Sequence, residues 1–326
     1  VNYIRDTRED YIMTPKLKGY LLGIIAAATY GMNPLFALPL YEAGMNPDSV
    51  LLLRYLVAIP ILGIMLLWRG RNFRLKRREL PPIISLGLLF SLSSLTLFQS
   101  YNYMDAGIAS TLLFIYPILV AIIMATLFKE RLSKQTILCI IVTLCGIALL
   151  YSNDDGSTLS LMGVMLVFAS AISYAIYIVG INKTSLRNVA TLKISFYVLT
   201  FGSLLFLSRL LVTHDFQVPS TDEWRLWINI LCLAVFPTVL SLVCTTKAIQ
   251  YIGATPTAIL GALEPVTAVV IGVSVFGEVI TSRIAIGLLL IIISVTFVIS
   301  DGNITLHLTR FRKMFPKITR KLRFKK

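Results

Sequence analysis

Six stretches of this chain carry no Asp, Glu, Lys or Arg, and each is about as long as a helix that crosses a lipid bilayer. They are Gly19–Tyr41, Pro81–Met104, Ala106–Phe128, Gln135–Asn153, Gly156–Asn182 and Leu226–Thr246. About 20 apolar residues in a helix cross the ~30 Å hydrocarbon core, where the backbone must satisfy its own hydrogen bonds. Four more apolar stretches carry only isolated charges: Asp48–Trp68, Asn188–Val212, Ala254–Gly277 and Arg283–Ser300. The sequence therefore predicts an all-α integral membrane protein with ten transmembrane helices.

The composition excludes a soluble protein. Of the 326 residues, 56% are hydrophobic and only 14% are charged, whereas about a quarter are charged in soluble domains. The loops between the predicted spans are too short to hold a further domain. The four cysteines (Cys139, Cys145, Cys232 and Cys244) fall inside predicted spans without metal-ligand spacing, so we expect packed thiols, no bound metal and no cofactor.

Basic residues are distributed unevenly over the ends of the predicted spans. With a cytoplasmic N-terminus, 25 of the 30 Lys and Arg residues lie at cytoplasmic ends and 3 at outer ends. Because cytoplasmic loops are enriched in Lys and Arg, we expect a multi-pass protein of the inner or plasma membrane with both termini in the cytoplasm. The same bias explains most of the net charge of +14, so no nucleic-acid partner is expected.

Both ends of the chain are predicted to lie at the cytoplasmic surface. Residues 1–16 carry charges of both signs and lack the apolar core of a signal peptide, so they are expected to form a cytoplasmic N-terminal segment. Residues 301–326 form a basic cytoplasmic tail, in which basic and apolar residues alternate from Leu306 onward. Two interpretations of this tail stay open: an amphipathic helix on anionic lipid, or a flexible segment that only enforces the topology.

Two segments match each other without a gap at an offset of 148 residues. The matching pairs are Tyr103 and Tyr251, Ala106 and Ala254, Pro117 and Pro265, Phe128 and Phe276, Glu130 and Glu278, and Ser152 and Ser300. We therefore expect two five-helix repeats, 17–152 and 159–300, and the odd number of helices inverts the second repeat in the membrane. Inverted repeats with a site at their interface are typical of secondary transporters that work by alternating access. The mid-span prolines Pro117 and Pro265 are expected to break their helices.

These features resemble the drug/metabolite transporter superfamily, EamA type. The resemblance rests on Pro117 followed by Lys129-Glu130-Arg131, on Glu264-Pro265 followed by Gly277-Glu278, and on Arg54 in the second span. It covers about residues 17–300. It implies ten helices in two inverted halves and a transporter, often an exporter of amino acids or related metabolites.

Two charged residues inside the spans are the strongest candidates for substrate binding. Glu264 lies roughly 16 Å into its span and Arg54 about 9 Å below the outer surface, at 1.5 Å per residue. Charged groups in a bilayer are costly and usually functional. We expect Glu264 to bind a substrate ammonium or to carry a proton, and Arg54 to hold a carboxylate, as a zwitterion requires. The structural alternatives are a carboxyl that satisfies the break at Pro265 and an Arg54 that bonds helix ends.

Further polar and aromatic residues within the spans are candidates for a cavity lining. They are Tyr30, Asn33, Gln99, Tyr103, Tyr116, Tyr174 and Tyr177. Asn33 is the strongest of them, because it precedes Pro34, which frees a backbone carbonyl beside the amide. Each of the others has packing or helix bonding as its structural alternative.

The function expected from these residues is export of amino acids or related zwitterions, by a monomer or homodimer with or without proton coupling. Nucleoside- or vitamin-like metabolites and lipophilic cations are the alternative substrates. An enzyme is not expected, because both histidines, His214 and His307, lie outside the spans and no HExxH or GxSxG motif occurs. A channel normally requires a pore lined by rings of residues, and a single central Glu264 per chain disfavours one.

Overall fold

The computed structural model describes residues 14–104, 106–130, 133–150, 160–276, 282–283, 285–294 and 297, in which all regular secondary structure is helical. Its helices are α1 (Pro15–Tyr30), α2 (Asn33–Glu42), α3 (Pro47–Trp68), α4 (Leu80–Ser100), α5 (Ala106–Leu113), α6 (Tyr116–Thr126), α7 (Lys134–Leu150), α8 (Leu161–Lys183), η1 (Ser185–Asn188), α9 (Thr191–Thr213), α10 (Trp224–Leu233), η2 (Ala234–Leu240), α11 (Ser241–Ile252), α12 (Ala254–Leu260) and α13 (Leu263–Phe276). A further helical segment is Ala285–Ser294. Most of the N-terminal segment 1–16 and all of the basic tail 301–326, with its predicted lipid-binding stretch, lie outside the described residues.

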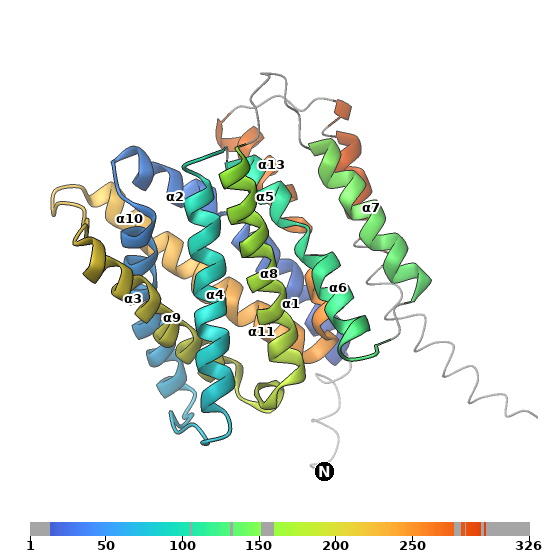
Figure 1. The fold of residues 1–326 in the computed structure, drawn as a ribbon, viewed down its shortest axis with the longest axis horizontal. Helices are drawn as coiled ribbons and strands as arrows, with labels where there is room; N and C mark the ends of the chain where they lie inside the picture. Colours follow the sequence, from blue (N-terminus) through green and yellow to red (C-terminus); the bar gives the residue numbers. More distant parts are fainter. Residues whose placement is uncertain are drawn as a thin grey trace, which may run out of the picture.

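Within the described residues these helices form ten membrane spans. Six are continuous apolar segments long enough to cross a bilayer by length and composition: Pro15–Glu42, Pro47–Trp68, Leu80–Ser100, Leu161–Lys183, Thr191–Thr213 and Trp224–Ile252. The other four are α5 with α6, α7, α12 with α13, and the segment Ala285–Ser294. Figure 1 shows α3 and α9 at one edge of the bundle, α7 at the other, and α1, α4 and α8 between them. The ten-helix membrane fold predicted from the ten apolar stretches is confirmed.

The packing follows an approximate two-fold symmetry that exchanges the halves of the chain. The third span, α4, packs along the sixth, α8, and the first span, α1, packs in the equivalent way along α11 of the eighth. The second spans of the two halves, α3 and α9, pack on each other, and α6 and α5 of the fourth span pack on α12 and α13 of the ninth. Because each half has an odd number of spans, the second half runs through the membrane in the opposite sense to the first. The two inverted five-helix repeats expected from the sequence offset are present.

Hydrogen bonds between the two halves of the chain hold α3 and α9 together at both ends of the pair, in two clamps. Where α3 begins, the Gln217 side chain accepts from the Asn46 amide at 2.6 Å, and the Gln217 amide donates to Ser49 Oγ at 2.9 Å. Where α9 begins, on the other face, the Tyr197 hydroxyl donates to the Phe73 carbonyl at 2.8 Å. In each clamp the loop that follows one helix of the pair is bound to the start of the other helix. The clamps therefore repeat the two-fold symmetry at the two ends of the α3–α9 pair.

Glycines bring α4 and α9 together at backbone distance. A Cβ on Gly87 of α4 would lie 2.9 Å from the carbonyl oxygen of Val198, and one on Gly202 of α9 would lie 3.0 Å from the carbonyl oxygen of Gly87. Helices in a bilayer associate by close packing more than by the hydrophobic effect, so small residues at a crossing stabilise it. This crossing fixes the first half of the chain against the second.

We expect Gly87→Ala to lower the melting temperature of the detergent-solubilised protein, because its methyl group would meet a helix carbonyl that cannot rotate away. Overpacking of this kind costs about 1–3 kcal/mol of unfolding free energy. Gly63→Ala in α3 is the matched control, since its Cβ would meet only the Phe196 ring, at the ordinary distance of 3.4 Å. Intrinsic fluorescence during heating measures both variants. Equal melting temperatures would contradict the close α4–α9 crossing.

Candidate functional site

Three broken spans meet near the middle of the bundle. The helices are interrupted at residues 31–32, 114–115 and 261–262. A proline stands among the first three residues of each second segment: Pro34, Pro117 and Pro265. Proline fits there because the first N–H groups of a helix have no intrahelical acceptor. Broken helices in a membrane are tolerated where the opened backbone faces protein or a cavity, so these breaks indicate where a site is built.

The broken spans touch through their backbones. A Cβ on Gly31 would lie 2.5 Å from the carbonyl oxygen of Glu264. The Tyr116 hydroxyl donates to the Ala258 carbonyl at 3.1 Å, near the end of α12, and a Cβ on Gly261 would collide with that hydroxyl. Tyr116 and Glu264 occupy equivalent positions in the two repeats, 148 residues apart. The two-fold symmetry therefore brings a tyrosine and a glutamate together where the repeats cross.

Glu264 lies in the first turn of α13 and is 8% exposed. The N-terminus of a helix carries a partial positive charge, which favours a carboxylate. Among the described residues Glu264 forms no salt bridge. It lines two small cavities. An acidic side chain in this setting is expensive in a bilayer and marks a functional position.

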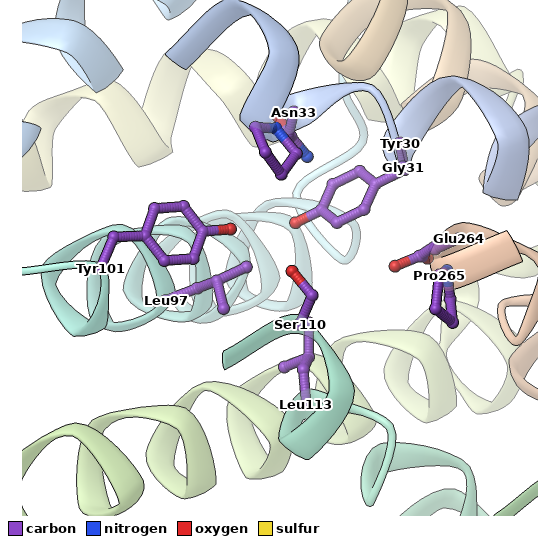
Figure 2. Close-up of a pocket in the computed structure, with 10 residues that line it drawn as sticks. Tyr30, Gly31, Asn33, Leu97, Tyr101, Ser110, Leu113, Glu264 and Pro265 are labelled. Atoms are coloured by element: carbon purple, nitrogen blue, oxygen red, sulfur yellow. The ribbon is translucent and has the colours of Figure 1, made fainter. Parts of the chain in front are cut away.

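The larger cavity is lined by both polar and apolar residues. Its lining residues are Tyr30, Gly31, Asn33, Pro34, Leu97, Tyr101, Ser110, Leu113, Glu264 and Pro265. Figure 2 shows the hydroxyl groups of Tyr30, Tyr101 and Ser110 pointing toward a common space, which the Glu264 carboxyl faces from the side opposite Tyr101. The cavity volume is about 20 Å³, little more than the ~10–15 Å³ that one water needs. The protein is therefore closed around this point.

Tyrosine rings lie between the larger cavity and the smaller one. Tyr30, from the larger cavity, stacks on Tyr174 with ring centroids 6.3 Å apart, and Tyr174 meets Tyr116 edge-on at 4.9 Å. Tyr174 and Tyr116 line the smaller cavity, together with Gly23, Ala26, Ala27, Ile178, Thr245, Thr257, Gly261 and Glu264. Glu264 is thus the residue common to both cavities, and the aromatic stack separates them.

Arg54 is fully buried and lies behind the cavity wall rather than on it. Its Nη1 donates to Asn33 Oδ1 at 3.1 Å and its Nη2 to the Pro237 carbonyl at 3.3 Å, while its Nε donates to Thr238 Oγ1. The guanidinium also lies over the Phe98 ring, 5.6 Å from the centroid. Arg54 therefore joins the start of α2 to the π-helical segment η2 in the other half, and it reaches the cavity only through Asn33.

The structure places three of the predicted lining residues elsewhere. Gln99 donates to Asp48 Oδ2 at 3.3 Å, beside the 2.7 Å salt bridge between Arg209 and Asp48. Tyr103 is 48% exposed at the end of the third span. Tyr177 is buried against Phe90, with ring centroids 4.9 Å apart. None of the three lines either cavity.

Other lining residues are absent from the sequence-based prediction, most clearly Tyr101 and Ser110. Tyr101 follows Leu97 by four residues, so the two share one face at the end of α4. The spacing of four residues would therefore identify Tyr101 as a lining residue if the position of Leu97 were given. Ser110 carries no such signal, because serine is common in membrane helices and its position depends on the break in the fourth span.

Comparison with known proteins agrees with this architecture. The model of the EamA-like transporter family matches residues 17–152 and again residues 161–300. The chain is 28% identical to the uncharacterized transporter YvbV of Bacillus subtilis (strain 168), covering 87% of this chain and 92% of that protein. It is 30% identical to an uncharacterized transporter of Synechocystis sp. (strain PCC 6803), covering 76% and 77%.

A solved structure shares the fold, with a TM-score of 0.72 at 17% identity over 86% of this chain and 95% of the other. The family match spans both halves, and the relatives are named as transporters. The described helices supply the membrane spans that such a protein requires. This chain therefore belongs to the EamA-like transporter family and is a multi-pass membrane transporter.

Proposed function

We propose that this protein exports amino acids or related small zwitterions by alternating access. The observation that carries the proposal is the position of Glu264, a buried carboxyl group that faces a cavity where three broken spans from both repeats meet. A carboxylate at that position supplies a counter-charge for a substrate ammonium. The same carboxyl group is suited to taking up a proton in exchange for the substrate.

The cavity lining fits a small metabolite that combines polar groups with a modest apolar part. Its polar groups are the Tyr30, Tyr101 and Ser110 hydroxyls, the Asn33 amide and the Glu264 carboxyl, and Leu97 and Leu113 contribute apolar surface. Few polar groups on a mostly apolar wall are the usual pattern of a small-molecule site. At about 20 Å³ the cavity is too small for an amino acid, so binding requires the repeats to move apart. Inverted repeats provide two such openings, one to each side of the membrane.

The proposed orientation places both termini in the cytoplasm of the inner or plasma membrane. The loop between α3 and α4 holds Arg69, Arg71, Arg74, Lys76, Arg77 and Arg78. The loop between α9 and α10, on the other face, holds no Lys or Arg and carries Asp215, Asp222 and Glu223. Positive loops remain on the cytoplasmic side during insertion, which supports this orientation.

A second candidate substrate class is the lipophilic cations. Arg54 lies off the cavity surface, so no positive group on the wall repels a cation. Tyrosine rings beside a carboxylate form a favourable cation site, and Tyr30, Tyr101 and Glu264 line one cavity. This class is tested in the same assay as amino acids.

We expect the purified protein in liposomes preloaded with unlabelled amino acids to take up labelled amino acids by saturable counterflow. Glu264→Gln should lower this exchange by about a hundredfold, because the ammonium loses its counter-charge in a low-dielectric site. Glu42→Gln, on the exposed end of α2, is the matched control and should exchange normally. Labelled tetraphenylphosphonium, offered as the substrate in the same liposomes, tests the cation class.

The outcomes of this assay separate the proposals. No exchange of any amino acid by protein that melts cooperatively would refute the amino-acid proposal, and saturable uptake of labelled tetraphenylphosphonium by the same protein would replace it with the cation class. Accumulation driven by an imposed pH gradient, and absent in Glu264→Gln, would establish proton coupling. Exchange without such accumulation would establish facilitated transport.

The orientation is tested by labelling single cysteines in intact cells. In a background where Cys139, Cys145, Cys232 and Cys244 are replaced by serine or alanine, we expect Ser220→Cys to react with a membrane-impermeant maleimide. We expect Asn72→Cys, in the basic loop after α3, to react only after the cells are permeabilised. The reverse pattern would place both termini outside.

A further inference from the structure

Asn33 presents an unpaired hydrogen-bond donor beside the larger cavity. It is the first residue of α2, directly after the break in the first span, and its side chain is 2% exposed. It lines the cavity on the same wall as Tyr30 (Figure 2). Its Nδ2 atom is buried and has no hydrogen-bond partner in the part of the chain that the structure describes. A buried amide donor is costly when it stays unpaired, so this position calls for an acceptor that enters the cavity.

The orientation of this amide is set by Arg54. Arginine only donates hydrogen bonds, so the 3.1 Å contact from Arg54 Nη1 must be to the amide oxygen of Asn33. The amide nitrogen is thereby turned away from the guanidinium. Arg54 itself cannot swing, since its other nitrogen atoms bond to Thr238 Oγ1 and the Pro237 carbonyl. Because Arg54 can only donate, Asn33 must present its amide nitrogen, a donor, to the cavity.

We propose that Asn33 recognises the carboxylate of the substrate, and that Arg54 is a positioning residue that holds the Asn33 amide and places a positive charge behind it. This inference rests on the proposed transport of zwitterions and assigns the second half of their recognition. The guanidinium has no acidic partner among the described residues, so its field is available to an anionic group in the cavity. The carboxylate is bound through the amide and not by the guanidinium directly.

The cavity then has two chemically different ends. Asn33 offers N–H donors and Glu264 offers carboxyl oxygens, and the two residues line one cavity across Gly31, which contacts the Glu264 backbone. An amino acid supplies an acceptor to the first and a cation to the second over a short span. A substrate with only a cationic group would leave the Asn33 donor unpaired.

The test uses two analogues of leucine, each lacking one of its charged groups, and measures how strongly each inhibits the counterflow of labelled L-leucine. Isopentylamine is leucine without its carboxylate, and 4-methylpentanoate is leucine without its ammonium. If another amino acid exchanges faster, its own amine and acid replace these probes. In Asn33→Leu we expect inhibition by 4-methylpentanoate to weaken about tenfold or more, as the loss of a hydrogen bond to a charged group predicts. Inhibition by isopentylamine should stay within about twofold, since that probe does not use this donor.

Asn33→Asp keeps an acceptor for Arg54 and so is expected to fold where the leucine variant does not. It should abolish inhibition by the acid and strengthen inhibition by the amine, because a carboxylate then faces the cavity. Asn102→Asp, at an exposed asparagine after α4, is the matched control and should retain the wild-type preference. Arg54→Lys should raise the KM for leucine with little change in the maximal rate, because lysine cannot hold its three partners together.

Two results would overturn the inference, and they are distinguishable. Wild-type leucine exchange with an unchanged ratio of acid to amine inhibition in the Asn33 variants would refute the role of Asn33 and leave the transport proposal standing. No amino-acid exchange by folded wild-type protein would refute both.

Discussion

A buried guanidinium connects two segments of this protein that depart from helical geometry, one in each repeat. Pro237 has no N–H to donate, and the carbonyl of Leu233, four residues earlier, instead receives the Thr238 hydroxyl at 2.7 Å. That hydroxyl and the Pro237 carbonyl accept from Arg54, which also reaches Asn33 at the break in the first span. A charge inside a membrane protein is tolerated when its donors are matched. The two irregular segments thus supply the side-chain and backbone acceptors that the charge needs, and the charge in turn holds these segments of both repeats in place.

The closed cavity and the clamps indicate where movement is least costly. At the α4–α9 crossing, Gly87 and Gly202 bring backbone against backbone, so separation there loses many dispersion contacts at once. The end clamps consist of a few hydrogen bonds, such as that from Tyr197 to the Phe73 carbonyl, each worth about 1 kcal/mol net. In the proposed cycle the repeats therefore open at one end of the α3–α9 pair at a time, while the glycine crossing stays packed.

The sequence predicts those features that a single segment determines. Long apolar stretches with few or no charges predict the ten spans, the fixed offset predicts the inverted halves, and an acid within a span beside a proline identifies Glu264. The sequence does not predict how each helix is rotated about its own axis, because that rotation is set by packing against helices that are distant in the chain. Tyr101 and Tyr103 both follow the last residue of α4, and only the first of them lines the cavity. Gln99 lies within α4 and bonds to Asp48 of the preceding helix, α3, and it does not line the cavity.

The balance of charge within the bundle favours a zwitterion over a simple cation. Arg54 and an ionised Glu264 together leave the interior near neutrality, and Asp48, the other buried acid among the described residues, is already paired with Arg209. An uncompensated charge in a low-dielectric interior costs several kcal/mol. A bound cation would neutralise Glu264 and leave the charge of Arg54 without compensation. A zwitterion adds no net charge, and its carboxylate faces the Arg54 side of the cavity through Asn33, so both interior charges are compensated when the protein closes around it.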